Sequence, residues 1–208
     1  MNIFTILLTI HICFGTLSLL CAAGALYATK GAWWHRHFGE FFFCGMTGVF
    51  VTAIPMSIII SSVFLFAIAI FSYYLAFTGW RFARNTSGIP SAIDWLVSSI
   101  MLIVAIGMLG GGWYLYKTNS THAVILLVFG GIGALLSKGN LKIYQQGGVQ
   151  GKERIVKHFS SMIGATIAAV TAFVVTNFHF QPAIVLWLGP TVVLVPVIFW
   201  WKRRIYVE

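Results

Sequence analysis

Apolar residues run through this chain in long blocks that short polar clusters separate. Seven blocks have about the 17–25 residues that a membrane-spanning helix needs. The predicted spans are 3–28, 38–54, 57–79, 92–116, 121–137, 156–177 and 182–201. The pattern therefore predicts an all-α, polytopic bundle of seven transmembrane helices, which forms a single transmembrane domain over residues 1–208.

The second and third spans come from one apolar run that is too long for a single crossing. Pro55, Met56 and Ser57 interrupt this run. Proline breaks or kinks a helix interior, so we expect a hairpin turn at this point.

The composition agrees with a protein that lies almost wholly in the bilayer. The chain is 59% hydrophobic and 8% charged, whereas ordinary globular domains have about 45–50% apolar and about 25% charged residues. The net charge of +9 comes from basic residues between the apolar blocks and not from one basic patch. We therefore expect the lipid bilayer as the main partner and no nucleic acid.

The basic residues also predict an orientation. Twelve of the 13 lie on one side of the predicted topology, and Lys117 lies alone on the other. Loops rich in Lys and Arg stay in the cytoplasm, so the N-terminus is predicted outside and the C-terminus inside. A reporter at Asn119 should then be extracytoplasmic and one at Gln146 cytoplasmic.

Small residues indicate which faces of the helices pack closely, because they let helices approach in lipid. The first span carries such a stripe through Gly15, Ser18 and Ala22, and the fourth carries Gly107 and Gly111. The sixth carries a similar stripe of alanines. The expected bundle core is therefore the first, fourth and sixth spans.

The six histidines fall into two groups. The predicted cytoplasmic group contains His35, His37 and His158, with the two acidic residues Glu40 and Asp94 near them. The predicted outer group contains His11, His122 and His179, with Asn177 and Gln181 as polar neighbours in the sequence.

His11 lies inside the first span, on its small-residue stripe. An ionisable residue within the membrane suggests a functional site. The alternative is a neutral histidine that is hydrogen-bonded across the bundle, to Asn177 or to a backbone carbonyl.

The stretch KGAWWHRHFGE (residues 30–40) supports two interpretations as well. Tryptophans and Arg36 are typical of the headgroup region, which favours an interfacial anchor. A ligand or proton-relay role for His35, His37 or Glu40 is the alternative. On a helix, His35 and His37 point about 200° apart, so the two cannot face one metal ion.

Histidine pairs across the bundle would also suit a b-type haem, which takes two axial imidazoles. The candidate ligands are His158 with His35 or His37, and His11 with His179 or His122. His158 and His179 are about 31 Å apart along one helix, which is very far for direct electron exchange between two such haems. The cofactor itself is left open by the sequence.

Three segments carry a resemblance to a known family: KGAWWHRHFG, HFSSMIGATIAAVTAFVVTNF and WLGPTVVLVPVIFWWKRR. Together they resemble an uncharacterised family of bacterial multi-spanning membrane proteins, catalogued as a domain of unknown function. The resemblance implies a protein of the bacterial inner membrane and brings no activity with it. It marks His35, Arg36 and His158 as the first positions to test.

Three functions remain open. Serine-hydrolase, zincin and P-loop motifs are missing from the sequence, which disfavours an enzyme. The leading hypothesis is an integral-membrane binding or accessory protein without hydrolytic chemistry, as a subunit of a larger membrane complex. The alternatives are a haem or redox-linked protein and a small-solute carrier or channel gated near Gly189 and Pro190, where the last span would bend.

Overall fold

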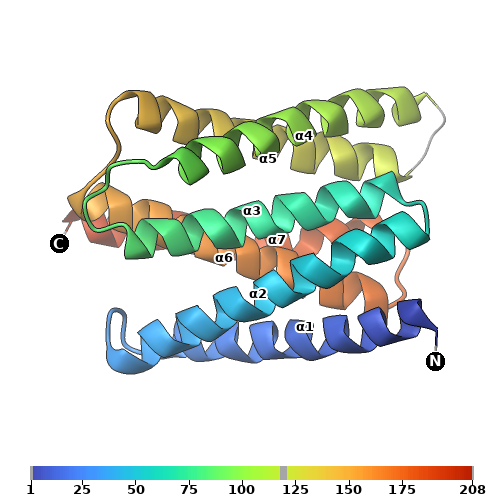
Figure 1. Cartoon of the computed structure of the whole chain (residues 1–208), viewed down its shortest axis with the longest axis horizontal. Helices are drawn as coiled ribbons and strands as arrows, with labels where there is room; N and C mark the ends of the chain where they lie inside the picture. Colours follow the sequence, from blue (N-terminus) through green and yellow to red (C-terminus); the bar gives the residue numbers. More distant parts are fainter. Residues whose placement is uncertain (1, 118–120, 208) are drawn as a thin grey trace.

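The computed structural model describes residues 2–117 and 121–207, and all regular structure in these residues is α-helical (Figure 1). The helices are α1 (Ile3–Tyr27), α2 (Trp33–Ile59), α3 (Val63–Arg84), α4 (Ala92–Tyr116), α5 (Thr121–Gln145), α6 (Gly151–Asn177) and α7 (Ile184–Val207). All seven are long and apolar enough to cross a membrane. The predicted all-α bundle of seven transmembrane helices is confirmed.

Local capping explains where several helices begin. The Asn2 side chain accepts a hydrogen bond from the Thr5 amide (2.8 Å) and starts α1. Ser91 and Asp94 form a reciprocal capping box at the start of α4. These polar side chains satisfy amide donors that the first turn of a helix leaves free.

The predicted turn at Pro55 is wrong, because Pro55 lies inside α2. The helix resumes its bonding after the proline, with the Ile60 amide donating to the Met56 carbonyl (3.1 Å). The chain reverses over residues 60–62 instead, where Ser61 adopts a φ of 54°. Ser62 then caps α3 by accepting from the Leu65 amide (3.2 Å).

Several helices extend beyond the apolar blocks that predicted them. Helix α2 starts at Trp33, α5 continues to Gln145 and α6 starts at Gly151. Hydropathy reports the thickness of the hydrocarbon layer, whereas a helix continues into polar sequence until a turn or a glycine ends it. The histidines at 35 and 37 are therefore in the first two turns of a helix and not in a loop.

The bundle is built around α3 and α6, which pack on each other. The α1–α2 hairpin lies on one side of this pair, the α4–α5 hairpin lies on the other, and α7 packs along α6 (Figure 1). Only 6% of the most apolar stretch of α1 is buried, against 39% of that of α3. Of the three helices predicted as the core, only α6 is central.

The small-residue stripe of α1 packs against α2 rather than against the bundle centre. Ser18 of α1 is fully buried, and a Cβ added at Gly45 of α2 would clash with its hydroxyl. Gly24 allows the Phe38 ring to approach in the same way, since an added Cβ would lie 2.9 Å from that ring. The glycines thus allow the close approach that was expected, with a different partner helix.

One end of the bundle collects the loops 28–32, 85–91 and 146–150 and the C-terminus (Figure 1). We call it the basic end, because 12 of the 13 Lys and Arg residues lie on this side of the helices. Two of its loops are joined by a hydrogen bond from the Val149 amide to the Gly88 carbonyl (3.2 Å). The cytoplasmic location of the basic end remains a prediction, and Asn119, the proposed site for an outer reporter, is outside the described residues.

Candidate functional site

The basic end brings together two of the predicted site residues from distant parts of the chain. His35 is in the first turn of α2, and His158 is in the second turn of α6. Their imidazole rings meet edge to face, with 6.4 Å between ring centres and 86° between ring planes. Both side chains are part-buried. We call these two residues the histidine pair.

Each ring of the pair is held by a backbone carbonyl. His35 Nδ1 lies 3.0 Å from the Ala25 carbonyl oxygen of α1, and His158 Nδ1 lies 2.8 Å from the Gly79 carbonyl oxygen of α3. A carbonyl oxygen only accepts hydrogen bonds, so Nδ1 carries the proton on both rings. In the neutral form, Nε2 then keeps its lone pair on both histidines.

Two cations, Lys30 and Arg154, lie near the histidine pair. The Lys30 ammonium donates to the same Ala25 carbonyl that holds His35 (3.1 Å), and it lies 4.7 Å from the centre of the Trp201 ring. Desolvation by partial burial lowers the pKa of Lys30 from its usual value. Arg154 is one turn before His158 on α6 and donates to the Phe82 carbonyl (2.6 Å). The site therefore combines two imidazoles with two nearby cations.

His37 does not join the pair. Its ring stacks on Trp33 at 3.9 Å between centres, and its Nδ1 donates to the Trp33 carbonyl one turn earlier (2.9 Å). Glu40 binds Arg84 (2.8 Å) in an exposed salt bridge. Among the described residues, no group of three His, Cys, Asp or Glu side chains is placed to hold a metal ion.

The outer histidines are not brought together in the predicted pairs. His11 contacts α2, where its Nδ1 lies 2.9 Å from the Thr52 hydroxyl. Since Thr52 donates its own proton to the Gly48 or Val49 carbonyl, it accepts from His11. The suggested partner Asn177 donates instead to the Phe173 carbonyl of its own helix (2.8 Å).

The other two outer histidines are separate from His11. His122 packs on the Phe64 ring, with 4.6 Å between centres, and His179 is exposed in the turn after α6. The bond between His11 and Thr52 joins α1 to α2, and the functional and packing interpretations of His11 both stay predictions.

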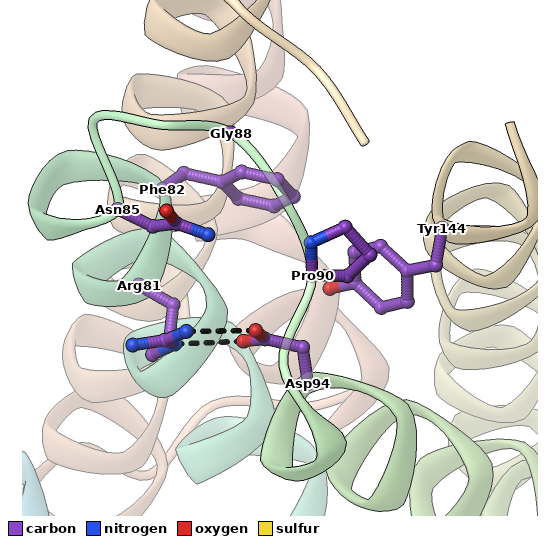
Figure 2. A pocket seen from close by; sticks show the side chains of 7 residues that line it. All are labelled: Arg81, Phe82, Asn85, Gly88, Pro90, Asp94 and Tyr144. Atoms are coloured by element: carbon purple, nitrogen blue, oxygen red, sulfur yellow. Dashed lines mark hydrogen bonds and ion pairs between the residues drawn. The ribbon is translucent and has the colours of Figure 1, made fainter. Parts of the chain in front are cut away.

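Asp94, at the basic end, has a carboxylate that accepts four hydrogen bonds. Its carboxylate accepts from Arg81 Nε and Nη2, both at 2.7 Å, in a two-point ion pair between α4 and α3 (Figure 2). It also accepts from the Ser91 amide (2.8 Å) and hydroxyl (2.7 Å). These contacts leave the carboxylate little capacity for a ligand, and they indicate a structural role for Asp94.

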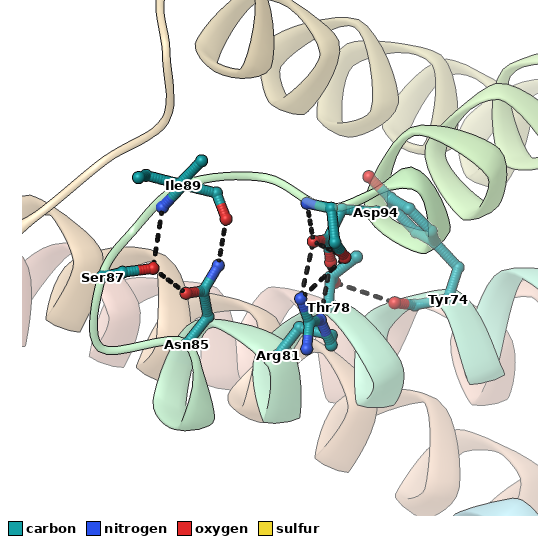
Figure 3. Close-up of polar contacts among 8 residues, drawn as sticks. Tyr74, Thr78, Arg81, Asn85, Ser87, Ile89 and Asp94 are labelled. Carbon is teal, nitrogen blue, oxygen red and sulfur yellow. Dashed lines mark hydrogen bonds and ion pairs between the residues drawn. The ribbon is translucent and has the colours of Figure 1, made fainter.

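A small cavity adjoins this ion pair. It has a volume of about 10 Å³, close to that of one water molecule, and its lining includes Asp94, Pro90 and Tyr144 (Figure 2). The loop beside it is fixed by Asn85, which donates to the Ile89 carbonyl (2.6 Å) and accepts from Ser87 (2.8 Å) (Figure 3). At this volume the cavity is too small for a substrate.

A set of hydrogen-bonded polar side chains, which the sequence analysis did not predict, joins three helices. Asn140 of α5 donates to the Tyr74 hydroxyl of α3 (2.7 Å), and Lys157 of α6 lies 3.5 Å from the Asn140 amide oxygen. Asn140 lay beyond the predicted end of its span, so it counted as a loop residue. A polar side chain just outside an apolar block was the signal that could have found it.

Pro190 and Gly189 lie in a continuous helix. Helix α7 contains both Pro190 and Pro196 without a break, and none of its most apolar stretch is buried. The helix is thus continuous through the residues where a gate was expected, and the carrier alternative stays a prediction.

The arrangement defines a class of protein: an integral membrane protein of seven transmembrane helices with a polar, cationic end. Comparison with protein-family models, with curated proteins and with solved structures finds no match to this chain.

Proposed function

We propose that the protein is an integral-membrane accessory subunit, which binds a transmembrane helix of a larger membrane complex on the outer face of α4. The observation that supports this proposal is a pair of glycines, Gly107 and Gly110, against which no other described helix packs. Both are exposed, and a Cβ added at either would have nothing within 4 Å.

Several other helix glycines of this chain are used for packing, whereas Gly39, Gly131 and Gly189 are also open but each is the one such glycine described on its helix. An added Cβ would lie 2.7 Å from Met162 at Gly79, 2.9 Å from Leu127 at Gly112 and 3.0 Å from Met108 at Gly130. Glycine in a helix interior costs about 1 kcal/mol relative to alanine, and membrane helices use it mainly where another helix approaches closely. Gly107 and Gly110 carry this cost without a partner inside the chain.

The residues around these glycines also suit a helix–helix contact. Ile103 and Ile106 precede them on the exposed side of α4, at 69% and 60% exposure. Two small residues flanked by large apolar ones form a shallow groove that a transmembrane helix can fill. Following the family resemblance, we place this complex in the bacterial inner membrane, with the basic end in the cytoplasm.

The test is the substitution Gly107→Leu, with Gly189→Leu on α7 as the matched control. Both sites have open space above the glycine, so neither change should disturb the bundle itself. We expect Gly107→Leu to abolish co-purification of a membrane partner from native membranes, while Gly189→Leu retains it. Equal recovery of partners by wild type and Gly107→Leu would reject the proposal.

A further inference from the structure

We propose that the histidine pair is an axial ligand site for a b-type haem at the basic end of the bundle. This inference is independent of the docking face on α4, because it rests on His35 and His158 alone. The separation of the two rings, the hydrogen bonds that fix their tautomers and the number of ligands support this cofactor.

The spacing of the two rings fits coordination by one metal ion. Two imidazoles on opposite sides of an iron atom, each with a metal–nitrogen bond of about 2 Å, have ring centres roughly 6 Å apart. The centres of His35 and His158 are 6.4 Å apart. The two helices therefore already hold the rings at the separation that axial ligation requires.

The hydrogen bonds of the pair prepare both rings as ligands. A ligating histidine almost always donates its second ring N–H to a carboxylate or a carbonyl, which fixes the tautomer and makes the free nitrogen a better donor to metal. His35 and His158 both do so, through the carbonyls of Ala25 and Gly79. In contrast, His37 Nδ1 donates to the Trp33 carbonyl of its own helix, and the His37 ring stacks on Trp33.

The number of ligands distinguishes haem from a bare metal ion. Protein sites for zinc and similar ions use three or four side-chain ligands. The described residues offer no third His, Cys, Asp or Glu beside the pair. A porphyrin brings four nitrogen ligands of its own and takes two axial ligands from the protein, which is the number available here.

The surroundings of the pair bear on the rest of the cofactor. Among the described residues, α2 and α6 do not approach each other closely, so side chains and not backbone fill the space between them. Entry of a flat macrocycle therefore requires the side chains between the two helices to move. Lys30 and Arg154, the cations that would pair with its two propionates, already donate to backbone carbonyls and would have to exchange these hydrogen bonds.

The experiment is a titration of the purified, detergent-solubilised chain with hemin, followed by absorbance and by electron paramagnetic resonance. The wild type should bind one hemin per chain and show a low-spin iron with two imidazole ligands. His37→Gln, two residues away on the same helix, is the matched control and should behave like the wild type.

The substitutions His35→Gln and His158→Gln should each remove the low-spin signal. Loss of an axial ligand should weaken binding at least as much as loss of an outer partner does, which is typically about 10–100-fold. Circular dichroism and gel filtration check that each variant is folded. His158→Gly with added imidazole provides a second test, since free imidazole should restore the low-spin spectrum if His158 is a ligand.

Two results would overturn the proposal. One is a folded wild-type chain that binds no hemin in the titration. The other is a hemin signal that persists unchanged in both His35→Gln and His158→Gln, which would assign binding to other groups or to the detergent.

Discussion

The ion pair between Arg81 and Asp94 gives the sharpest prediction about stability. Asp94 is 5% exposed and accepts four hydrogen bonds, two from Arg81 and two from Ser91. The substitution Asp94→Asn removes the charge and keeps the shape of the side chain. An amide nitrogen would then face the guanidinium donors of Arg81, and the capping box at the start of α4 would be weakened.

The magnitude follows from burial. Breaking a buried pair by removing one partner costs about 3–5 kcal/mol. The Arg81 side chain is 23% exposed, so water can solvate part of its unpaired charge. We therefore expect Asp94→Asn to lower the free energy of unfolding by about 2–3 kcal/mol, which is at or below the lower limit of that range.

The second salt bridge of the described residues is the matched control. Glu40 binds Arg84 at 2.8 Å, but the two side chains are 44% and 58% exposed. Exposed pairs contribute about 0–1 kcal/mol, so Glu40→Gln should have little effect. Both changes convert a carboxylate that binds arginine into an amide, and they differ mainly in burial.

Unfolding by sodium dodecyl sulfate, followed by circular dichroism in mixed micelles, measures both variants against the wild type. The reasoning predicts a clear loss of stability for Asp94→Asn and almost none for Glu40→Gln. Equal losses of unfolding free energy in the two variants, or an unchanged midpoint for Asp94→Asn, would refute the claim that burial makes the Asp94–Arg81 ion pair important for stability.

Two further predictions concern the basic end. Gly148 has a φ of 106°, and an added Cβ would clash with the Gly88 carbonyl. Gly148→Ala should therefore lower the free energy of unfolding by roughly 1–3 kcal/mol in the same assay. An unfolding midpoint equal to that of the wild type would contradict this. Of two reporters fused at Gln146, only the one that requires a cytoplasmic location should be active, because 12 of the 13 basic residues lie on this side. Activity of only the reporter that requires an extracytoplasmic location would reverse the predicted orientation.

The sequence was sufficient for the number of helices and for the end at which charge collects. Each apolar block is long enough to cross a bilayer, and the bilayer forces such a segment to be helical, since no other structure satisfies its backbone there. The alternation of basic and neutral loops then placed His35 and His158 at the same end, which made their pairing one of the predicted alternatives.

The choice of neighbouring helices could not be predicted in the same way. In lipid, an apolar surface does not distinguish a core helix from a peripheral one, so hydropathy alone could not show that α3 is central and α1 peripheral. The choice depends instead on close packing between particular residues, such as Gly45 against Ser18, which only the three-dimensional structure shows. For the same reason, Thr52 was not recognised as the partner of His11.

The hairpin between α2 and α3 shows a second limit. Pro55 is a strong breaker in water, but a membrane helix tolerates a proline when the rest of its backbone remains bonded. Ser61 and Ser62 carry the actual turn, through a left-handed residue and a helix cap. A pair of serines inside an apolar run was the weaker signal in the sequence and the correct one.

The contact between His35 and His158 carries the proposed haem site, so the most direct test measures that contact itself. The double substitution His35→Cys and His158→Cys, in a chain whose free cysteines Cys13, Cys21 and Cys44 are replaced by alanine, should form a link with a short thiol cross-linker. After cleavage in the loop 146–150, linked fragments should migrate together on a gel. The control with cysteines at 37 and 158 should yield separate fragments. Equal linking in both variants, or none at 35 and 158 in folded protein, would contradict the account.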